Sequence, residues 1–435
     1  MAGKHNYGWV IFSLSFTNLL VEGGIKNTVP VVYVALRDSF RWSAAVTSGV
    51  FSLGGLTGAL WAPLLGRLLD RIGPRALFPL GGLLILMGYL TSSCANELWQ
   101  LYLLYSILAT VGENAISSFT TAAILSPWFP RNRGRMLGLA DTGNSLGQVV
   151  FLPLAQWLIS TIGWRDTFRI FGVLFFLLVG PANFLLQRRP PIQQVIARGG
   201  RPLETEASSP LVEEGRDLDE ASSSQISVTD TRRMQQILRH PPVWFLVMAR
   251  LLATMGNHLT HVHIMAFFIT AGYNPLLAAS AIGAVGLVGM AGRPLSGALS
   301  DVLGREVVYT VGSGMQIGGL GVLLALGDGQ RLWPMILFVA LNGLSDGIGG
   351  LVVGAKAADL VPSSALGSVM GLVQMGRGLG IMMGPLIGGL LFDLEGNYVV
   401  AFILAVALMF VAIGCMWRAS LTGSSRRTFP EGMLM

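Results

Sequence analysis

Long apolar segments, separated by short polar connections, follow one another along most of the chain. An α-helix needs about 20 mainly apolar residues to cross the roughly 30 Å hydrocarbon core of a bilayer. The pattern therefore predicts an all-α membrane protein with twelve transmembrane helices. The twelve segments are 8–34, 44–68, 76–95, 100–127, 136–160, 166–187, 241–270, 276–300, 306–326, 332–358, 366–392 and 397–418.

One stretch breaks this pattern near the middle of the chain. Residues 188–240 are rich in Arg, Glu, Ser and Pro, and carry eight cationic and eight anionic side chains. Such a composition is typical of a polar linker that buries no core. We expect an N-terminal six-helix bundle (1–187), a cytoplasmic linker (188–240), a C-terminal six-helix bundle (241–418) and a cytoplasmic tail (419–435). The linker is interpreted as a tether, with a regulatory role as the alternative.

Composition and charge agree with a membrane protein. The chain is 52% hydrophobic and 12% charged, and its mean hydropathy of +0.62 excludes an ordinary soluble domain. Outside the linker, eleven Lys or Arg residues fall on the side of the termini and five on the other. The positive-inside rule then places both termini in the cytoplasm, in a multi-pass protein of the cell inner (plasma) membrane. The net charge of +6 is thereby explained without nucleic-acid binding, and we expect a monomer in the lipid bilayer.

An eleven-residue pattern occurs twice, 231 positions apart, at 63–73 and 294–304. Both copies read Pro-Leu-x-Gly-x-Leu-x-Asp-x-x-Gly, and each ends an apolar segment at the same place in its half. A repeat of this kind indicates a duplicated membrane unit, hence two pseudo-symmetric halves, as in transporters.

The first copy also carries a known loop signature. Gly66-x3-Asp70-Arg71-x-Gly73-x-Arg75 resembles the signature of the major facilitator superfamily between the second and third helices. The resemblance implies the major facilitator fold and a conformational latch of the outward-open state. The expected latch residues are Gly66, Asp70, Arg71, Gly73, Arg75, Gly297, Asp301, Gly304 and Arg305.

Further segments resemble one branch of that superfamily, the monocarboxylate porters, especially bacterial members and the related oxalate/formate exchangers. The similar segments are Tyr7-Gly8-Trp9, Trp128-Phe129, Gly143-x2-Leu146-Gly147, Gly163-Trp164-Arg165 and Gly380-x3-Gly384-Pro385. The resemblance implies a secondary transporter that moves a small organic monocarboxylate by alternating access, with a proton as the candidate coupling ion. An organic anion exchanger and a non-transporting membrane sensor remain alternatives.

Two cations lie deep in apolar segments. Lys26 and Arg293 would together cost roughly 5 to 7 kcal/mol if they faced lipid, so we expect them to face a central cavity and clamp an anion. The family resemblance implies the same role for a Lys in the first helix and an Arg before Pro in the eighth. For Lys26 the alternative is an ion pair with Glu22, four residues earlier on nearly the same helix face.

The chain departs from the family pattern beside Arg293. Many members have Asp four residues before this Arg, where this chain has Gly289. Stand-in proton carriers are Glu22, Glu113, Asp141 and Asp346, because a carboxyl group in a poorly hydrated cavity takes up a proton more readily.

Other polar residues of the apolar segments complete the predicted substrate site. They are Asn114, Asn144, His258 and His261. The two histidines stand three residues apart, but no carboxylate or cysteine accompanies them, so we expect no metal. Arg250 either supports the anion site or pairs with a carboxylate, and Arg377 is a candidate partner of Asp346 or Glu113. No nucleophile and base occur together, so neither an enzyme nor a cofactor is expected.

Overall fold

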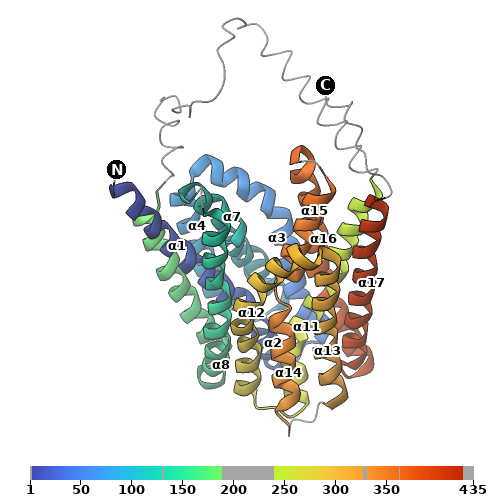
Figure 1. The fold of residues 1–435 in the computed structure, drawn as a ribbon. Coiled ribbons are helices and arrows are strands. Elements are labelled where there is room, and N and C mark those ends of the chain that lie inside the picture. Colours follow the sequence, from blue (N-terminus) through green and yellow to red (C-terminus); the bar gives the residue numbers. More distant parts are fainter. Residues whose placement is uncertain (1, 130–131, 189–239, 327–330, 362, 425–435) are drawn as a thin grey trace, which may run out of the picture.

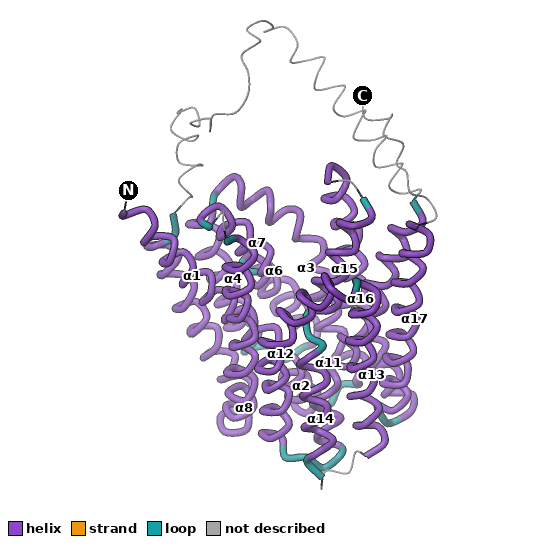
Figure 2. Tube along the Cα trace, in the orientation of Figure 1, coloured by secondary structure: helices purple, strands orange, loops and turns teal. Residues whose placement is uncertain are grey.

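The computed structural model describes residues 2–129, 132–188, 240–326, 331–361 and 363–424. Within these residues every regular element is a helix (Figure 2). Nearly all of the predicted linker, residues 189–239, and the last residues of the tail, 425–435, lie outside the described residues.

The N-terminal bundle contains the elements α1 to α8. Their bounds are α1 Ala2–Asn27, α2 Val29–Phe40, α3 Ala44–Ile72, α4 Pro74–Ser92, α5 Leu98–Leu103, the π-helix η1 Leu104–Ala109, α6 Thr110–Ala115, α7 Ser118–Leu125, the 3₁₀-helix η2 Ser126–Trp128 and α8 Arg133–Leu186. These elements correspond to the first six predicted segments. Two predicted segments lie in α8, which changes direction at Gly163, where φ is 82°.

The C-terminal bundle contains the elements α11 to α17. Their bounds are α11 Pro241–Thr270, α12 Pro275–Leu303, α13 Arg305–Leu326, α14 Trp333–Leu344, α15 Ile348–Leu360, α16 Ser363–Glu395 and α17 Val399–Ser424. The seventh predicted segment, 241–270, matches α11 at both ends. The last helix continues to Ser424, six residues beyond the predicted boundary at 418, and the Thr422 hydroxyl donates to the backbone oxygen of Arg418 in this extension.

Three predicted helices are interrupted. The first bends at Asn27–Thr28 between α1 and α2, and the fourth is divided into α5, η1, α6, α7 and η2. The tenth is broken between α14 and α15, where Gly347 has φ 87°. Hydropathy does not detect such breaks, since the flanking residues stay apolar. Irregular backbone at membrane depth is tolerated where it is buried in protein or lines a polar space.

Nine segments of the described residues are long and apolar enough to cross a membrane. One of them, Gly134–Leu186, contains two crossings joined at Gly163. The fourth predicted helix is not among the nine, because each of its pieces is too short to cross a membrane. The seventh predicted helix, α11, is also not among the nine, and it carries the polar side chains of Arg250, His258 and His261.

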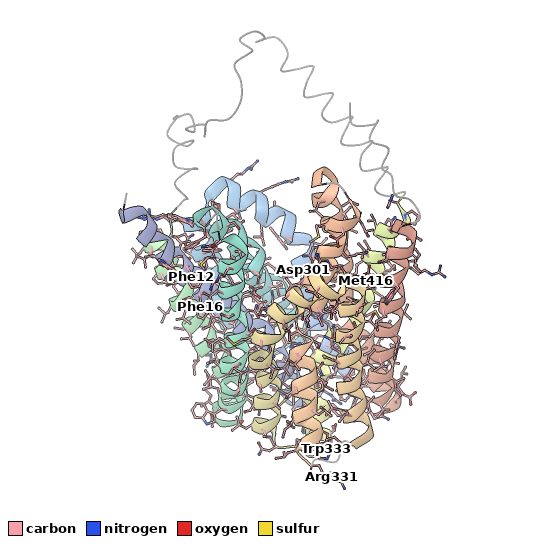
Figure 3. The ribbon with its side chains drawn as sticks, in the orientation of Figure 1. Phe12, Phe16, Asp301, Arg331, Trp333 and Met416 are labelled. Carbon is pink, nitrogen blue, oxygen red and sulfur yellow. The ribbon has the colours of Figure 1, made fainter. Side chains whose placement is uncertain are left out.

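The helices run side by side in two groups (Figure 1). In the N-terminal bundle α8 packs against α1 and α4, and in the C-terminal bundle α11 packs against α16 and α17. Between the bundles α3 contacts α16, and α8 contacts α12. We call the side where α1 begins and α17 ends the terminal face, and the side of Arg331 and Trp333 the opposite face (Figure 3).

The bundles are joined by hydrogen bonds toward the opposite face. There the Asp393 carboxylate accepts hydrogen bonds from the backbone N–H groups of Ala44 (2.7 Å) and Ala45 (2.8 Å) in the other bundle. The hydroxyl groups of Tyr33 and Tyr398 lie 3.1 Å apart across the same interface. Near the terminal face, by contrast, a Cβ added at Gly66 or Gly297 would meet no atom within 4 Å. Hydrogen bonds therefore join the two bundles toward the opposite face.

Candidate functional site

Arg293 in α12 lies between two carboxylates from other elements. Its Nη1 donates to Asp141 in α8 of the other bundle, and its Nε donates to Asp346 Oδ2 at 3.0 Å. The exposed fraction of the side chain is 25% for Arg293, 34% for Asp141 and 31% for Asp346, although all three residues lie in membrane-spanning segments. Because Arg293 bridges the bundles, this exposure indicates a solvent-accessible space between them.

A second cation is compensated within the N-terminal bundle. Lys26 Nζ donates to Glu22, which is the ion pair expected as the alternative to substrate contact. Glu22 is buried, whereas the Lys26 side chain is 43% exposed. Ser118 joins this pair to Asp141, since its hydroxyl lies 3.2 Å from Glu22 Oε2 and 3.3 Å from Asp141 Oδ1. A continuous polar network thus runs from Lys26 to Asp346.

Asp346 occupies the place where the family pattern puts its acid. A Cβ added at Gly289 would lie 2.6 Å from Asp346 Oδ2. The break between α14 and α15 carries Asp346 into this position. The carboxylate missing at position 289 is therefore supplied by another helix.

Glu113 and Asn114 lie just before the interruption between α6 and α7. Glu113 Oε1 is buried and has no hydrogen-bond partner, which is unusual for a carboxylate oxygen. The Asn114 amide donates to the backbone oxygen of Thr110 at 2.8 Å. Asn144 is half-buried, and its backbone lies against Gly23. Asn114 and Asn144 remain proposed substrate contacts.

The histidines of α11 lie in different surroundings. His258 Nδ1 is 3.1 Å from the backbone oxygen of Thr254, and His261 Nε2 is buried without a partner. His263 is fully buried and its Nε2 is 2.9 Å from the Pro385 oxygen. Among the described residues, no group of three or more His, Cys, Asp or Glu side chains could hold a metal ion.

Two arginines of the C-terminal bundle form no ion pair among the described residues, although Glu22 lies within electrostatic range of Arg377. Within the described part of the chain, no carboxylate oxygen lies within 4.0 Å of Arg250 or Arg377. The expectation that Arg377 pairs with Asp346 or Glu113 is wrong, because Asp346 binds Arg293 and Glu113 forms no ion pair. Arg250 and Arg377 lie within electrostatic range of one another and of His258.

The two copies of the repeated motif end at corresponding glycines. α3 ends at Gly73 (φ 75°) and α12 at Gly304 (φ 92°). In the second copy Arg305 pairs with Asp301 and with Asp359, the latter at 3.2 Å.

The cations of the first copy behave differently from Arg305. Arg75 Nε donates to the Phe184 oxygen at 2.8 Å, and Arg71 is exposed. The side chain of Asp70 lies outside the described part of the molecule. The latch function of both copies remains a prediction.

Some features of the site had a sequence signal that the hydrophobic pattern hid. Asp346-Gly347 is a dipeptide typical of turns, and Ser117-Ser118 interrupts an apolar run where a helix can begin again. Either signal predicts a broken helix. The pairing of Asp141 with Arg293, 152 residues apart, has no such local signal.

The comparisons with known proteins agree with this architecture. A family model described as Major Facilitator Superfamily matches residues 14–333 and 303–431. Monocarboxylate transporter 13 of Bos taurus is 28% identical over 411 residues, covering 94% of this chain and 88% of that protein. Monocarboxylate transporter 11 of Homo sapiens is 27% identical over 420 residues, covering 94% and 83%.

Solved structures resemble the fold as a whole. A bacterial homolog of the human lysosomal transporter Spinster, in an inward-facing and unoccupied conformation, superposes with a TM-score of 0.71 at 16% identity, covering 98% of this chain and 99% of the other. The fold is thus that of twelve transmembrane helices in two pseudo-symmetric six-helix bundles. The chain belongs to the major facilitator superfamily.

Proposed function

We propose that the protein is a secondary transporter that moves a small organic monocarboxylate together with a proton, by alternating access. The observation that carries this proposal is the position of Arg293 between Asp141 and Asp346. The names of the monocarboxylate transporters similar to this chain support the substrate class.

The charges of this triad favour coupling. While both carboxylates are ionised, they occupy the guanidinium of Arg293, and an incoming anion would meet two negative charges. A proton on Asp141 or Asp346 releases one side of the guanidinium, and the substrate carboxylate takes that place in a charge-assisted hydrogen bond. Proton and anion then bind together, and the charge of the site is unchanged.

The same step loosens the contact between the bundles. The Asp141–Arg293 pair joins α8 to α12 across the interface. Protonation of Asp141 removes this ionic link, so loading of the site and movement of the bundles involve the same two side chains. Such an intramembrane ionisable pair is a typical element of a proton pathway. We further propose that the terminal face is cytoplasmic, as the distribution of Lys and Arg indicates.

The test is uptake of labelled lactate or pyruvate by proteoliposomes that contain the full chain, with and without an imposed pH gradient. For the unmodified protein, we expect accumulation on the side of higher pH. Asp141→Asn and Asp346→Asn should each reduce gradient-driven uptake at least tenfold but retain counterflow without a gradient. The matched control is Asp166→Asn, which changes an exposed carboxylate paired with Arg169.

Other outcomes would decide against the proposal. Carboxylate exchange that ignores the pH gradient in the unmodified protein would favour an organic anion exchanger, for which Gly289 at the family's acidic position is the supporting observation. Preference for neutral or cationic solutes over both acids would exclude a monocarboxylate transporter.

A further inference from the structure

The cations of the membrane-spanning segments fall into two classes. Lys26 and Arg293 are compensated by Glu22, Asp141 and Asp346. Arg250 of α11 and Arg377 of α16 have no carboxylate within ion-pair distance among the described residues, and both are half-buried. Two neighbouring guanidinium groups repel one another, and an anion that binds between them would stabilise both.

The break in the tenth transmembrane segment lies beside Arg250. A Cβ added at Gly349 would lie 2.8 Å from Arg250 Nη1, so the guanidinium is held against the first turn of α15. This thirteen-residue helix begins after Gly347, and its N-terminus has no side-chain cap. The first backbone N–H groups of a helix and its dipole favour an anion at this end.

The same break connects this region to Arg293. A Cβ added at Gly347 would lie 2.8 Å from Arg293 Cγ. Arg293 and Arg250 thus approach the break at positions 347 and 349, two residues apart. Half-helix N-termini at the membrane midplane bind anionic groups in other transporter folds. Here the N-terminus of α15 lies between Arg293, which two acids occupy, and Arg250, which forms no ion pair with the described residues.

His258 adds a group that can donate a hydrogen bond. It follows Arg250 by eight residues on α11, a rise of about 12 Å, and it lies within electrostatic range of Arg377. Its Nδ1 lies 3.1 Å from the Thr254 oxygen, and no hydrogen bond involves its Nε2 among the described residues. Two guanidinium groups, an imidazole and a helix N-terminus thus lie in one region, in which Glu22 is within electrostatic range of Arg377 but forms its ion pair with Lys26.

We propose that Arg250 and Arg377, with His258 and the N-terminus of α15, form an anion-binding site in the C-terminal bundle that holds the carboxylate of the transported acid in the inward-facing state while Asp141 and Asp346 occupy Arg293. This site is separate from the Asp141–Arg293–Asp346 triad, which exchanges the proton. The proposal rests on the proposed function for the identity of its ligand, but not for its preference for anions.

The experiment measures binding to the purified full-length protein in detergent. The probes are pyruvate and, as an inorganic anion, sulfate, each titrated at constant ionic strength while the thermal unfolding midpoint is followed. We expect both anions to raise the midpoint of the unmodified protein. Arg250→Gln and Arg377→Gln should each raise at least tenfold the anion concentration needed for this stabilisation. Arg250→Lys should need less anion than Arg250→Gln. Counterflow of pyruvate should show the same rise in half-saturating concentration.

Matched variants separate this site from other effects. Arg169→Gln, which alters an exposed arginine paired with Asp166, should bind as the unmodified protein does. Size-exclusion chromatography checks that each variant is folded. Unchanged anion stabilisation and half-saturation in folded Arg250→Gln and Arg377→Gln proteins would overturn the proposal, whatever the result for proton coupling. Arginine-dependent anion binding without proton-driven uptake would support this site and contradict the proposed function.

Discussion

Gly289 and the Asp346 side chain lie next to each other beside Arg293. The space that a side chain at position 289 would occupy contains the Asp346 carboxylate, 2.6 Å from the added Cβ. A glycine at 289 is therefore required for the acid to approach from α14 and α15. One of the two carboxylates beside Arg293 thus comes from the break between α14 and α15.

The importance of the position of this acid can be tested by placing it at residue 289 of α12. Gly289→Asp alone should reduce gradient-driven uptake at least tenfold, because its side chain clashes with Asp346. The double variant Gly289→Asp, Asp346→Gly should recover pH-dependent uptake relative to either single change. The measurement is pyruvate uptake by proteoliposomes under a pH gradient. A double variant that is no better than Asp346→Gly would show that the two positions are not equivalent.

At the scale of single residues, sequence reasoning was most effective for local pairs. The four-residue spacing of Glu22 and Lys26 predicted an ion pair as one of two alternatives, and the structure shows this ion pair. The partners of Arg293 are 152 and 53 residues away. Such pairs depend on how helices pack, and no local pattern encodes them. Arg377 was assigned the wrong partners for the same reason.

At the scale of elements, the interruptions position the polar side chains. Ser118 lies at the start of α7 and Asp346 directly before α15, so each follows a break in a transmembrane segment. Hydrophobic patterns predicted the segments well, with α11 correct at both ends. They could not predict the breaks, because hydrogen-bond geometry changes there while apolar character does not.

The break before α15 should be sensitive to backbone conformation. Gly347 has φ 87°, and a left-handed conformation costs other residues about 1–2 kcal/mol. A Cβ there would also approach Arg293 Cγ. We expect Gly347→Ala to lower the thermal unfolding midpoint in detergent and to weaken pyruvate counterflow. Gly321→Ala in α13, where a Cβ would meet no atom within 4 Å, is the control and should leave both unchanged. Equal behaviour of the two variants would contradict a strained break.

At the scale of the whole molecule, the two bundles meet through different kinds of contact at their two ends. Toward the opposite face, Asp393 of α16 accepts from the first backbone N–H groups of α3, and Arg37 donates to the Tyr398 hydroxyl at 3.2 Å. Toward the terminal face, the motif residues Gly66 and Gly297 have free space beside them. The repeat predicted two halves correctly, but it did not indicate which end is closed.

The closed end should open more readily when Asp393 loses its charge. A carboxylate at a helix N-terminus contributes about 1 kcal/mol, so Asp393→Asn should favour the outward-facing state roughly fivefold. The measurement is labelling of Ser48→Cys, a buried position of α3, by a membrane-impermeant thiol reagent after Cys94 and Cys415 are replaced by Ala. Glu395→Gln, an exposed acid two residues away, is the control. Equal labelling rates in both variants would exclude this role.

The contact between Asp393 and α3 consists of two hydrogen bonds, in which one carboxylate accepts from two backbone N–H groups. Changes to the side chains of Ala44 and Ala45 leave those N–H groups in place, so among the three residues only the side chain of Asp393 controls these two hydrogen bonds. This residue is remote from the arginines and carboxylates of the candidate site. A substitution at position 393 can therefore change the equilibrium between the two states of the bundles while every side chain around Arg250 and Arg293 stays the same.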